Sequence, residues 1–182
     1  MKNPTHNGGV FWGICYNIPM KQKIIPWEVD VNSFSDKYVA GFLDGDGSIV
    51  ATVEKRPERR RFPYRIRLKV VFTQHNRHKK IIAALWKFLG RRGHIRDVSS
   101  HNLVELVIQD REEVTRILKR IRPHLIIKKR QALLMEKILK IYKKSRVNTR
   151  SSLFESEYAK IISLVKEIRK LNSNTGGKIK LL

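Results

Sequence analysis

The sequence predicts an α+β fold in which a four-stranded antiparallel sheet is covered by helices on one face. Two observations support this prediction. The hydrophobic period switches between helical and strand-like in the order α-β-β-α-β-β-α, and the strands within each pair are joined by short polar connections. Strands of this kind bury one face, which helices must cover. At 182 residues, the chain is long enough for one domain with a substantial core.

The first helix is expected at about residues 34–44, and it runs into the sequence DGDG at 44–47. Ser33 and Ser35 are candidate N-caps, and the glycines permit the backbone geometry of a helix end. A tight turn into a strand is an alternative interpretation of DGDG. An EF-hand loop is excluded, because its sixth and twelfth positions would hold isoleucine and lysine instead of glycine and glutamate.

Two features of this helix are unusual for one that only fills a core. Gly41 and Gly45 stand four residues apart beside Ala40, and such a strip of small residues lets another backbone approach closely. Asp44 and Asp46 lie at the negative end of the helix dipole, where a carboxylate costs about 0.3–1 kcal/mol. A compensating cation is therefore expected nearby.

The next two segments alternate in the manner of strands, at residues 48–54 and 63–73, with a basic connection at 55–61. In the second strand, Tyr64 and the apolar residues at every other position occupy one face. Basic residues occupy most of the opposite face. Eight basic residues and one acidic residue lie between positions 55 and 69. A cationic two-stranded ribbon has the width of a DNA major groove and the charge to bind phosphates.

The rest of the chain repeats the pattern and then adds helices. Residues 1–33 show no lasting period and are interpreted as an irregular arm that packs aromatic side chains on the domain, with an extension along DNA as the alternative. The arm leaves a domain at 34–182, with a core at 36–141 and C-terminal helices and a basic tail at 142–182. The remaining expected elements are a helix at 77–89 ended by Gly90, strands at 94–98 and 103–108, a helix from Asp110 to about residue 120, and helices at about 128–144 and 156–171.

The charge of the chain indicates a polyanionic partner. Lysine and arginine number 39 against 16 acidic residues, which gives a net charge of +23. An RNA-binding protein would share this composition. The single cysteine, Cys15, excludes a disulfide framework within the chain, and no apolar run approaches the 18 residues of a membrane span. We therefore expect no membrane partner, no secretion, and an intracellular location in cytoplasm, nucleoid or organelle matrix.

Residues 39–47, with the sequence VAGFLDGDG, resemble the signature helix of the LAGLIDADG homing endonucleases. The resemblance implies the αββαββα fold of that family, with a saddle-shaped sheet, over about residues 36–141. Only one copy of the motif is visible, which implies a homodimer in which two signature helices pack at the twofold axis. The residues expected at this dimer interface are Ala40, Gly41, Asp44 and Gly45.

The same resemblance implies the catalytic residues. Asp46 matches the closing acidic position, whose carboxylate binds divalent metal, and the backbone carbonyl of Gly45 completes the metal shell. Gln74 is expected to position the attacking water, and Lys128 to stabilise the developing phosphate charge. Oxygen ligands of this kind suit Mg²⁺ or Mn²⁺. The ordinary alternatives are that Gln74 simply ends a strand and that Lys128 is one of many solvated lysines.

DNA contacts are assigned to the polar face of the strands and to the residues that follow them. His78 stands where relatives often have a basic residue, and Arg77 is the alternative for that role. A cross-strand salt bridge is an equally good expectation for each glutamate. The predicted DNA-binding residues are Thr52, Glu54, Arg56, Arg59, Arg60, Arg61, Arg65, Arg67, Lys69, Val71, Arg77, His78, Arg96, Val98 and Glu105.

The function expected from the resemblance is a site-specific, metal-dependent homing endonuclease that makes double-strand breaks in a long pseudo-palindromic DNA target as a homodimer. Two alternatives use the same fold and charge: an RNA-binding maturase that assists the folding of intron RNA, and a regulator that binds DNA without cutting it. The run HNRH at residues 75–78 superficially suggests an HNH nuclease, but those residues belong on a different fold.

Overall fold

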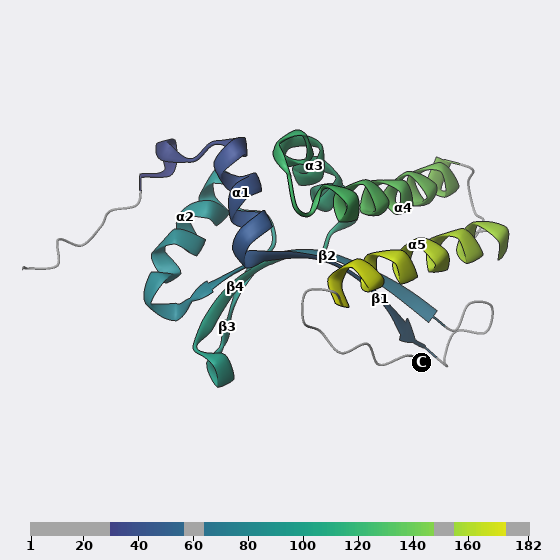
Figure 1. Ribbon diagram of the computed structural model, residues 1–182, viewed down its shortest axis with the longest axis horizontal. Coiled ribbons are helices and arrows are strands. Elements are labelled where there is room, and N and C mark those ends of the chain that lie inside the picture. The colour runs from purple at the N-terminus through teal and green to yellow at the C-terminus, as the bar shows by residue number, and fades with distance from the viewer. Residues whose placement is uncertain (1–29, 57–63, 148–154, 174–182) are drawn as a thin grey trace, which may run out of the picture.

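A computed structural model describes residues 30–56, 64–147 and 155–173. In these ranges, a four-stranded antiparallel sheet in the order β1-β2-β4-β3 carries helices on one face (Figure 1). The strands are β1 Gly47–Lys55, β2 Tyr64–His75, β3 His94–Val98 and β4 Leu103–Ile108. The helices are α1 Asp36–Asp46, α2 Lys79–Phe88, α3 Arg111–Ile121, α4 Lys129–Val147 and α5 Glu155–Ser173. Short 3-10 turns are η1 Val31–Ser33, η2 Asn76–His78, η3 Ser99–His101 and η4 Arg122–His124. The predicted fold class is confirmed.

Helix α1 begins and ends two residues later than the sequence pattern predicts. Ser35 is the N-cap, and its Oγ accepts a hydrogen bond of 3.2 Å from the amide of Tyr38. At the other end the helix continues through Asp46, and β1 starts at the next residue, Gly47. A Cβ at this glycine would lie 2.5 Å from Leu43 Cδ1 and 2.9 Å from the carbonyl oxygen of Val71. Glycine is therefore needed because α1 passes so close to β2.

The register of the sheet places β2 between β1 and β4. Strand β1 pairs with β2 from Gly47 opposite Phe72 to Lys55 opposite Tyr64. Only the second half of β2, from Val70 to His75, pairs with β4. Strands β3 and β4 have the predicted bounds, but β2 runs two residues further than predicted. Gln74 therefore lies within the strand, whereas the sequence analysis placed it after the strand.

The buried face of β2 is the predicted one, and the side chains of Ile66, Leu68, Val70 and Phe72 are at most 5% exposed. Tyr64 belongs to the same face but is 39% exposed, because it stands at the far end of the ribbon. Removing these side chains from water supplies the main driving force for packing the helices on the sheet.

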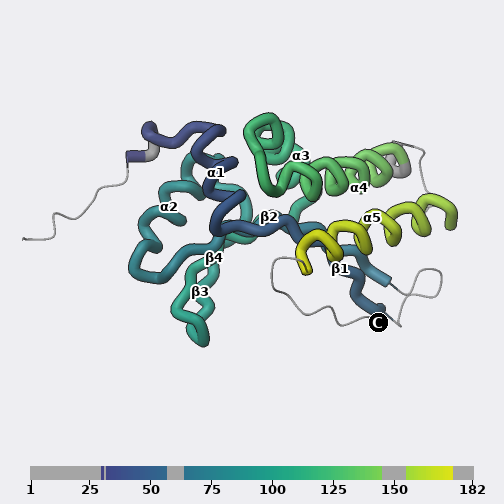
Figure 2. Tube along the Cα trace, viewed as in Figure 1, coloured from purple at the N-terminus to yellow at the C-terminus, as the bar shows by residue number. Residues whose placement is uncertain are grey.

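Helix α5 completes the core although it lies beyond the region that resembles the family. It runs alongside β1 (Figure 2), and Ile161, Val165 and Ile168 are buried in the same core as the sheet. Asn172 at its end donates a hydrogen bond of 2.9 Å to the carbonyl oxygen of Ile49. The helix therefore covers the outer edge of the sheet, where an unpaired strand would otherwise be open to association.

Of the predicted arm, only residues 30–33 lie within the described ranges. The predicted core boundary at 141 falls inside α4, which continues to Val147. No helix in the described part of the chain combines the length and apolar character needed to cross a membrane.

Candidate active site

The end of α1 brings two of the predicted catalytic residues together. Asp46 is the last residue of the helix, and its side chain is exposed. Gln74 projects from β2, and its Nε2 donates a hydrogen bond of 3.3 Å to Asp46 Oδ2. The other amide atom, Oε1, accepts a hydrogen bond of 2.8 Å from the amide of His75. The oxygen of the Gln74 amide is thus engaged by the backbone, and its NH₂ group is turned toward Asp46.

Lys128 reaches the same place from the segment that precedes α4. Its Nζ donates a hydrogen bond of 2.5 Å to the main-chain oxygen of Asp44. Burial lowers the pKa of Lys128 from its ordinary value, while the negative charges of Asp44 and Asp46 oppose that shift. Lys128 is therefore the cation that was expected at the negative end of α1. We call the group of Asp46, Gln74 and Lys128 the Asp46 corner.

Asp44 has a role that the sequence analysis missed. Its side chain is only 9% exposed, and its two oxygens accept hydrogen bonds from three consecutive amides. Oδ2 accepts from Ile126 at 2.7 Å and from Ile127 at 3.2 Å, and Oδ1 accepts from Lys128 at 2.8 Å. These bonds offset the unfavourable position of the carboxylate in the helix dipole. Because the partners lie more than 80 positions away in the sequence, no local signal indicates them.

The residues at the corner fit half of a divalent-metal site. The exposed carboxylate of Asp46, which accepts a hydrogen bond from Gln74, and the main-chain carbonyls at the end of α1 are hard oxygen donors, which Mg²⁺ and Mn²⁺ prefer. Within the described ranges, no three His, Cys, Asp or Glu side chains cluster as metal ligands would. Because the Asp44 oxygens are occupied by amides, one chain offers one carboxylate here. A complete site would need oxygen ligands from a second molecule.

Two of the four residues predicted at a dimer interface lie on the exposed side of α1. Gly41 and Gly45 face open space, since a Cβ at either position would meet no atom within 4 Å. The predicted place of Ala40 at the interface is corrected. Its side chain is completely buried in the core of its own chain and cannot contact a partner. The buried side chain of Asp44 is likewise turned into its own chain, although it too was assigned to the interface.

Three large apolar side chains beside this strip are exposed, and the sequence analysis did not identify them. Tyr38 on α1 is 47% exposed, and Ile126 and Ile127 are 86% and 65% exposed. The amides of the two isoleucines bind Asp44, which holds their side chains next to the end of α1. An apolar pair directly before the predicted catalytic lysine was the available signal.

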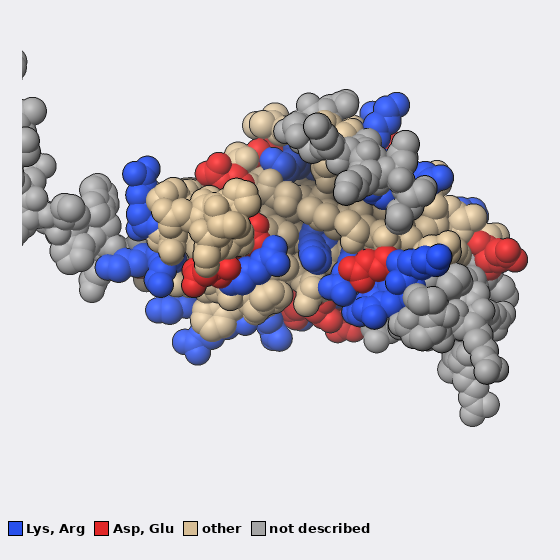
Figure 3. All heavy atoms as spheres, turned by 90° about the horizontal axis from the view of Figure 1, so that it is seen from below, with Lys and Arg blue, Asp and Glu red and all other residues tan. Residues whose placement is uncertain are grey.

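The predicted DNA-binding positions on the strands share the face of the sheet that the helices leave open, which we call the outer face. The register sets Thr52 opposite Arg67, Glu54 opposite Arg65, and Glu105 opposite Arg96, so these side chains point the same way. Figure 3 shows this side of the molecule, with lysine and arginine side chains spread among a few acidic ones. Val71 also belongs to this face but is only 7% exposed, which leaves it little surface for contact.

Both glutamates of the outer face form the salt bridges that the sequence analysis allowed for. Arg67 Nε lies 2.6 Å from Glu54 Oε1, and Arg96 Nη2 lies 2.6 Å from Glu105 Oε2. Arg65 and Lys69 lie on either side of Arg67 along β2 and on the same face. The predicted residues Arg59, Arg60 and Arg61 lie outside the described residues, whereas Arg56 is described and lies 3.9 Å from Glu54.

Arg77 and His78 follow directly after β2 in η2, and both are exposed. Arg77 Nε donates a hydrogen bond of 3.1 Å to His78 Nε2. The two candidates for an additional basic residue are therefore in contact with each other.

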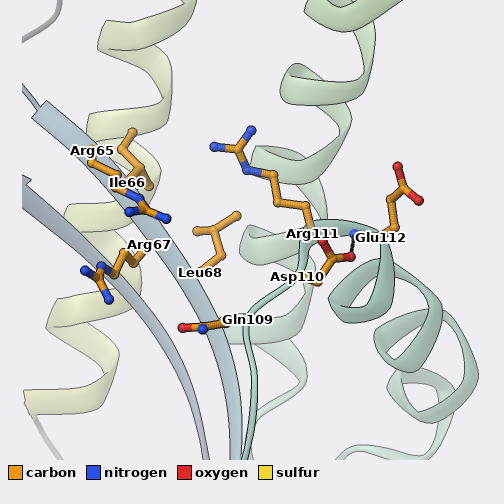
Figure 4. A pocket seen from close by; sticks show the side chains of 8 residues that line it. All are labelled: Arg65, Ile66, Arg67, Leu68, Gln109, Asp110, Arg111 and Glu112. Atoms are coloured by element: carbon orange, nitrogen blue, oxygen red, sulfur yellow. Dashed lines mark hydrogen bonds between the residues drawn. The ribbon is translucent and has the colours of Figure 1, made fainter. Parts of the chain in front are cut away.

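A cavity of about 520 Å³ lies where β2 extends beyond β4, and Figure 4 shows it between β2 and the start of α3. Arg65, Arg67 and Leu68 line one side, and Gln109 and Arg111 line the other. These strand positions lie at least four residues from Phe72, which pairs with Gly47, so the cavity is roughly 13 Å or more from the Asp46 corner. Asp110 and Glu112 also line it, so the recess carries acidic as well as basic side chains, and it is separate from the predicted catalytic residues.

Comparisons with known proteins agree with this geometry. Residues 39–133, more than half of the chain, match the family described as LAGLIDADG endonuclease. The chain is 30% identical over 102 residues to DNA endonuclease I-CreI of Chlamydomonas reinhardtii, a match that covers 56% of this chain and 60% of that protein.

Two solved structures show the same fold. The homing endonuclease I-CvuI, in complex with its target in the presence of calcium, matches with a TM-score of 0.67 and 24% identity over 81% of this chain and 85% of that one. The archaeal intron-encoded homing endonuclease I-Vdi141I, complexed with DNA, matches with a TM-score of 0.66 and 22% identity over 81% and 88%.

Proposed function

Since the chain belongs to the LAGLIDADG endonuclease family, we propose that it is a metal-dependent endonuclease that cuts both strands of a long, specific DNA site as a homodimer. The observation that carries this proposal is the Asp46 corner. An exposed carboxylate, an oriented amide and a lysine ammonium converge at the exposed end of the signature helix. Together they suit metal-assisted hydrolysis of a phosphodiester, which needs a metal ligand, a positioned water and positive charge on the phosphate.

The outer face of the sheet supplies the DNA-binding surface in this proposal. It carries arginine and lysine side chains on adjacent strands, and arginine recognises guanine in the major groove. The two salt bridges orient the guanidinium groups of Arg67 and Arg96 on this face, although each pair is worth at most about 1 kcal/mol. Because the substrate is DNA, we also propose that the protein acts inside the cell.

The homodimer is supported by two properties of a single chain. The corner supplies one exposed carboxylate, so two copies that pack at this end of α1 about a twofold axis would bring two together. The surface beside it exposes Gly41, Gly45, Ile126 and Ile127, and an isologous contact would pack this surface against its own copy. Burying each isoleucine would contribute about 1.5–3 kcal/mol.

The chemistry assigned to each residue follows from its contacts. A bound Mg²⁺ or Mn²⁺ would neutralise charge on the attacking and leaving oxygens. Asp46 and the carbonyl of Gly45 would hold that ion. The NH₂ group of Gln74, which is turned toward Asp46, would orient the attacking water, and the ammonium of Lys128 would stabilise negative charge that develops on the phosphate.

The test is selection of cleaved molecules from a randomised duplex DNA library in Mg²⁺. It is run in parallel on the wild type, on Asp46→Asn, and on the wild type with EDTA. We expect cut molecules that share a near-palindrome only from the metal-loaded wild type. If all three samples bind DNA and none cuts it, the endonuclease proposal fails. A DNA-binding regulator, or a maturase acting on intron RNA, would then account for the fold and the charge.

A further inference from the structure

Asp44 is a buried carboxylate two residues from Asp46, and its oxygens are already occupied. Both carboxylate oxygens accept hydrogen bonds from the amides of residues 126–128, at distances between 2.7 and 3.2 Å. Bonds from amides to an ionised carboxylate are stronger than those between neutral groups. Oδ2 accepts two of these bonds and Oδ1 accepts one, so the buried carboxylate is turned toward the amides of its own chain, and binding a metal ion would require breaking these bonds.

The same residue also binds the side chain that these amides precede. Lys128 is attached to Asp44 twice, by its amide to Oδ1 and by its Nζ to the main-chain oxygen. The backbone and the ammonium of the lysine are therefore both fixed relative to the end of α1. The neighbouring side chains of Ile126 and Ile127 point to solvent. Residues 126–128 thus present an apolar surface on one side and a catalytic cation on the other.

We propose that Asp44 is a positioning residue that holds the ammonium of Lys128 beside Asp46, and that it is not a metal ligand. The inference rests on the proposed function, in which Lys128 acts on the charge of the phosphate. The two aspartates of the DGDG sequence therefore have different roles. Asp46 binds the metal, and Asp44 binds the segment that carries the lysine.

A double-mutant cycle with Asp44→Asn and Lys128→Met tests this role in single-turnover cleavage. We expect each change alone to slow cleavage by about 10²-fold, because Asp44→Asn displaces the ammonium by about 1 Å and Lys128→Met removes it. The double variant should be no slower than Lys128→Met alone. Affinity for DNA in Ca²⁺ should stay within about twofold of the wild type. If the two effects multiply, Asp44 acts independently of Lys128 and the proposal is overturned.

The matched control is Asp36→Asn. Asp36 is an aspartate in the first turn of the same helix, where it pairs with Arg120 at 2.7 Å. The Asp36→Asn substitution should leave the cleavage rate unchanged and show no coupling with Lys128→Met. If Asp44→Asn fails to fold in a thermal melt, Asp44→Glu takes its place. The glutamate keeps the charge but is longer by one methylene group, and the same lack of additivity is expected.

Amide hydrogen exchange on the DNA-free protein separates this inference from the proposed function. In Asp44→Asn, the amides of Ile126, Ile127 and Lys128 should exchange faster than in the wild type, whereas Asp46→Asn should leave them unchanged. Wild-type exchange rates at all three amides would overturn the proposal. If these amides lose protection but the wild type cuts no DNA, the proposed function and the catalytic part of the inference fail, and only the structural attachment remains.

Discussion

At the scale of single residues, the structure separates residues of one type by their contacts. Asp44 and Asp46 are two positions apart in one helix, yet one is buried among amides and the other is exposed at a corner. Gly47 is required because α1 and β2 pass close to it, while Gly41 and Gly45 face open space. Substitutions at these positions should therefore have different effects.

Asp46→Asn should slow DNA cleavage by more than about 10²-fold, because the metal ligand that it removes supports several kcal/mol of charge stabilisation. The fold and the affinity for DNA in Ca²⁺ should persist, since the Asp46 side chain is exposed. Single-turnover cleavage and a binding titration measure the two quantities. Asp97→Asn, another exposed carboxylate, is the control and should cut at the wild-type rate.

Gly47→Ala should lower the free energy of unfolding by about 1–3 kcal/mol, because its Cβ would overlap Leu43 and the carbonyl of Val71. Denaturant unfolding followed by circular dichroism gives the value. Gly41→Ala is the matched control, and both substitutions are measured in the Ile127→Glu background, which is expected to be monomeric. No atom lies within 4 Å of its added Cβ, and alanine favours a helix by about 0.5–1 kcal/mol over glycine. If both substitutions change the free energy of unfolding of the monomer equally, the inference that α1 and β2 leave no room for a Cβ at Gly47 is wrong.

Glu54→Gln should change DNA binding more than stability. The salt bridge with Arg67 is partly exposed and contributes at most about 1 kcal/mol to folding. Loss of the negative charge leaves the Arg67 guanidinium available to bind phosphate or guanine, so the affinity for DNA should rise. The plot of log affinity against log salt concentration should become steeper by about one unit. Titrations at several salt concentrations measure this. Weaker binding by the variant would indicate instead that the glutamate itself contacts DNA.

At the scale of elements, α1 has a different neighbour on each of its sides. Val39, Ala40 and Leu43 face the core, and the opposite side is lined by glycine. The segment before α4 extends that exposed side with two isoleucines. One helix therefore joins the core, the candidate dimer surface and the candidate catalytic corner.

Gly41→Leu should convert the proposed dimer to a monomer, because a large side chain would prevent two copies of α1 from approaching closely. The monomer should remain folded, since the new side chain meets no atom of its own chain near its Cβ. Sedimentation velocity and a thermal melt measure assembly and folding. Ile127→Glu should have the same effect through repulsion of like charges. A variant that sediments with the wild type as a dimer would refute this placement of the interface.

At the scale of the whole molecule, a net charge of +23 should dominate the dependence of binding on salt. If six to ten phosphates are neutralised, affinity should fall by about 10³–10⁵ between about 50 and 200 mM salt. Equilibrium binding to one duplex at several salt concentrations gives the slope. An affinity that does not change with salt would contradict a cationic DNA-binding face.

The sequence by itself determined the fold class, the bounds of β3 and β4, the two faces of β2 and the small-residue strip of α1. These are properties of period, capping and charge, which act over a few residues. It did not determine that β2 includes Gln74, that Ala40 is buried, or that α5 covers the edge of β1. Only the tertiary structure decided these points, and it also brought Asp44 to the amides of residues 126–128. Such contacts join residues far apart in the chain, and packing selects them without any local pattern.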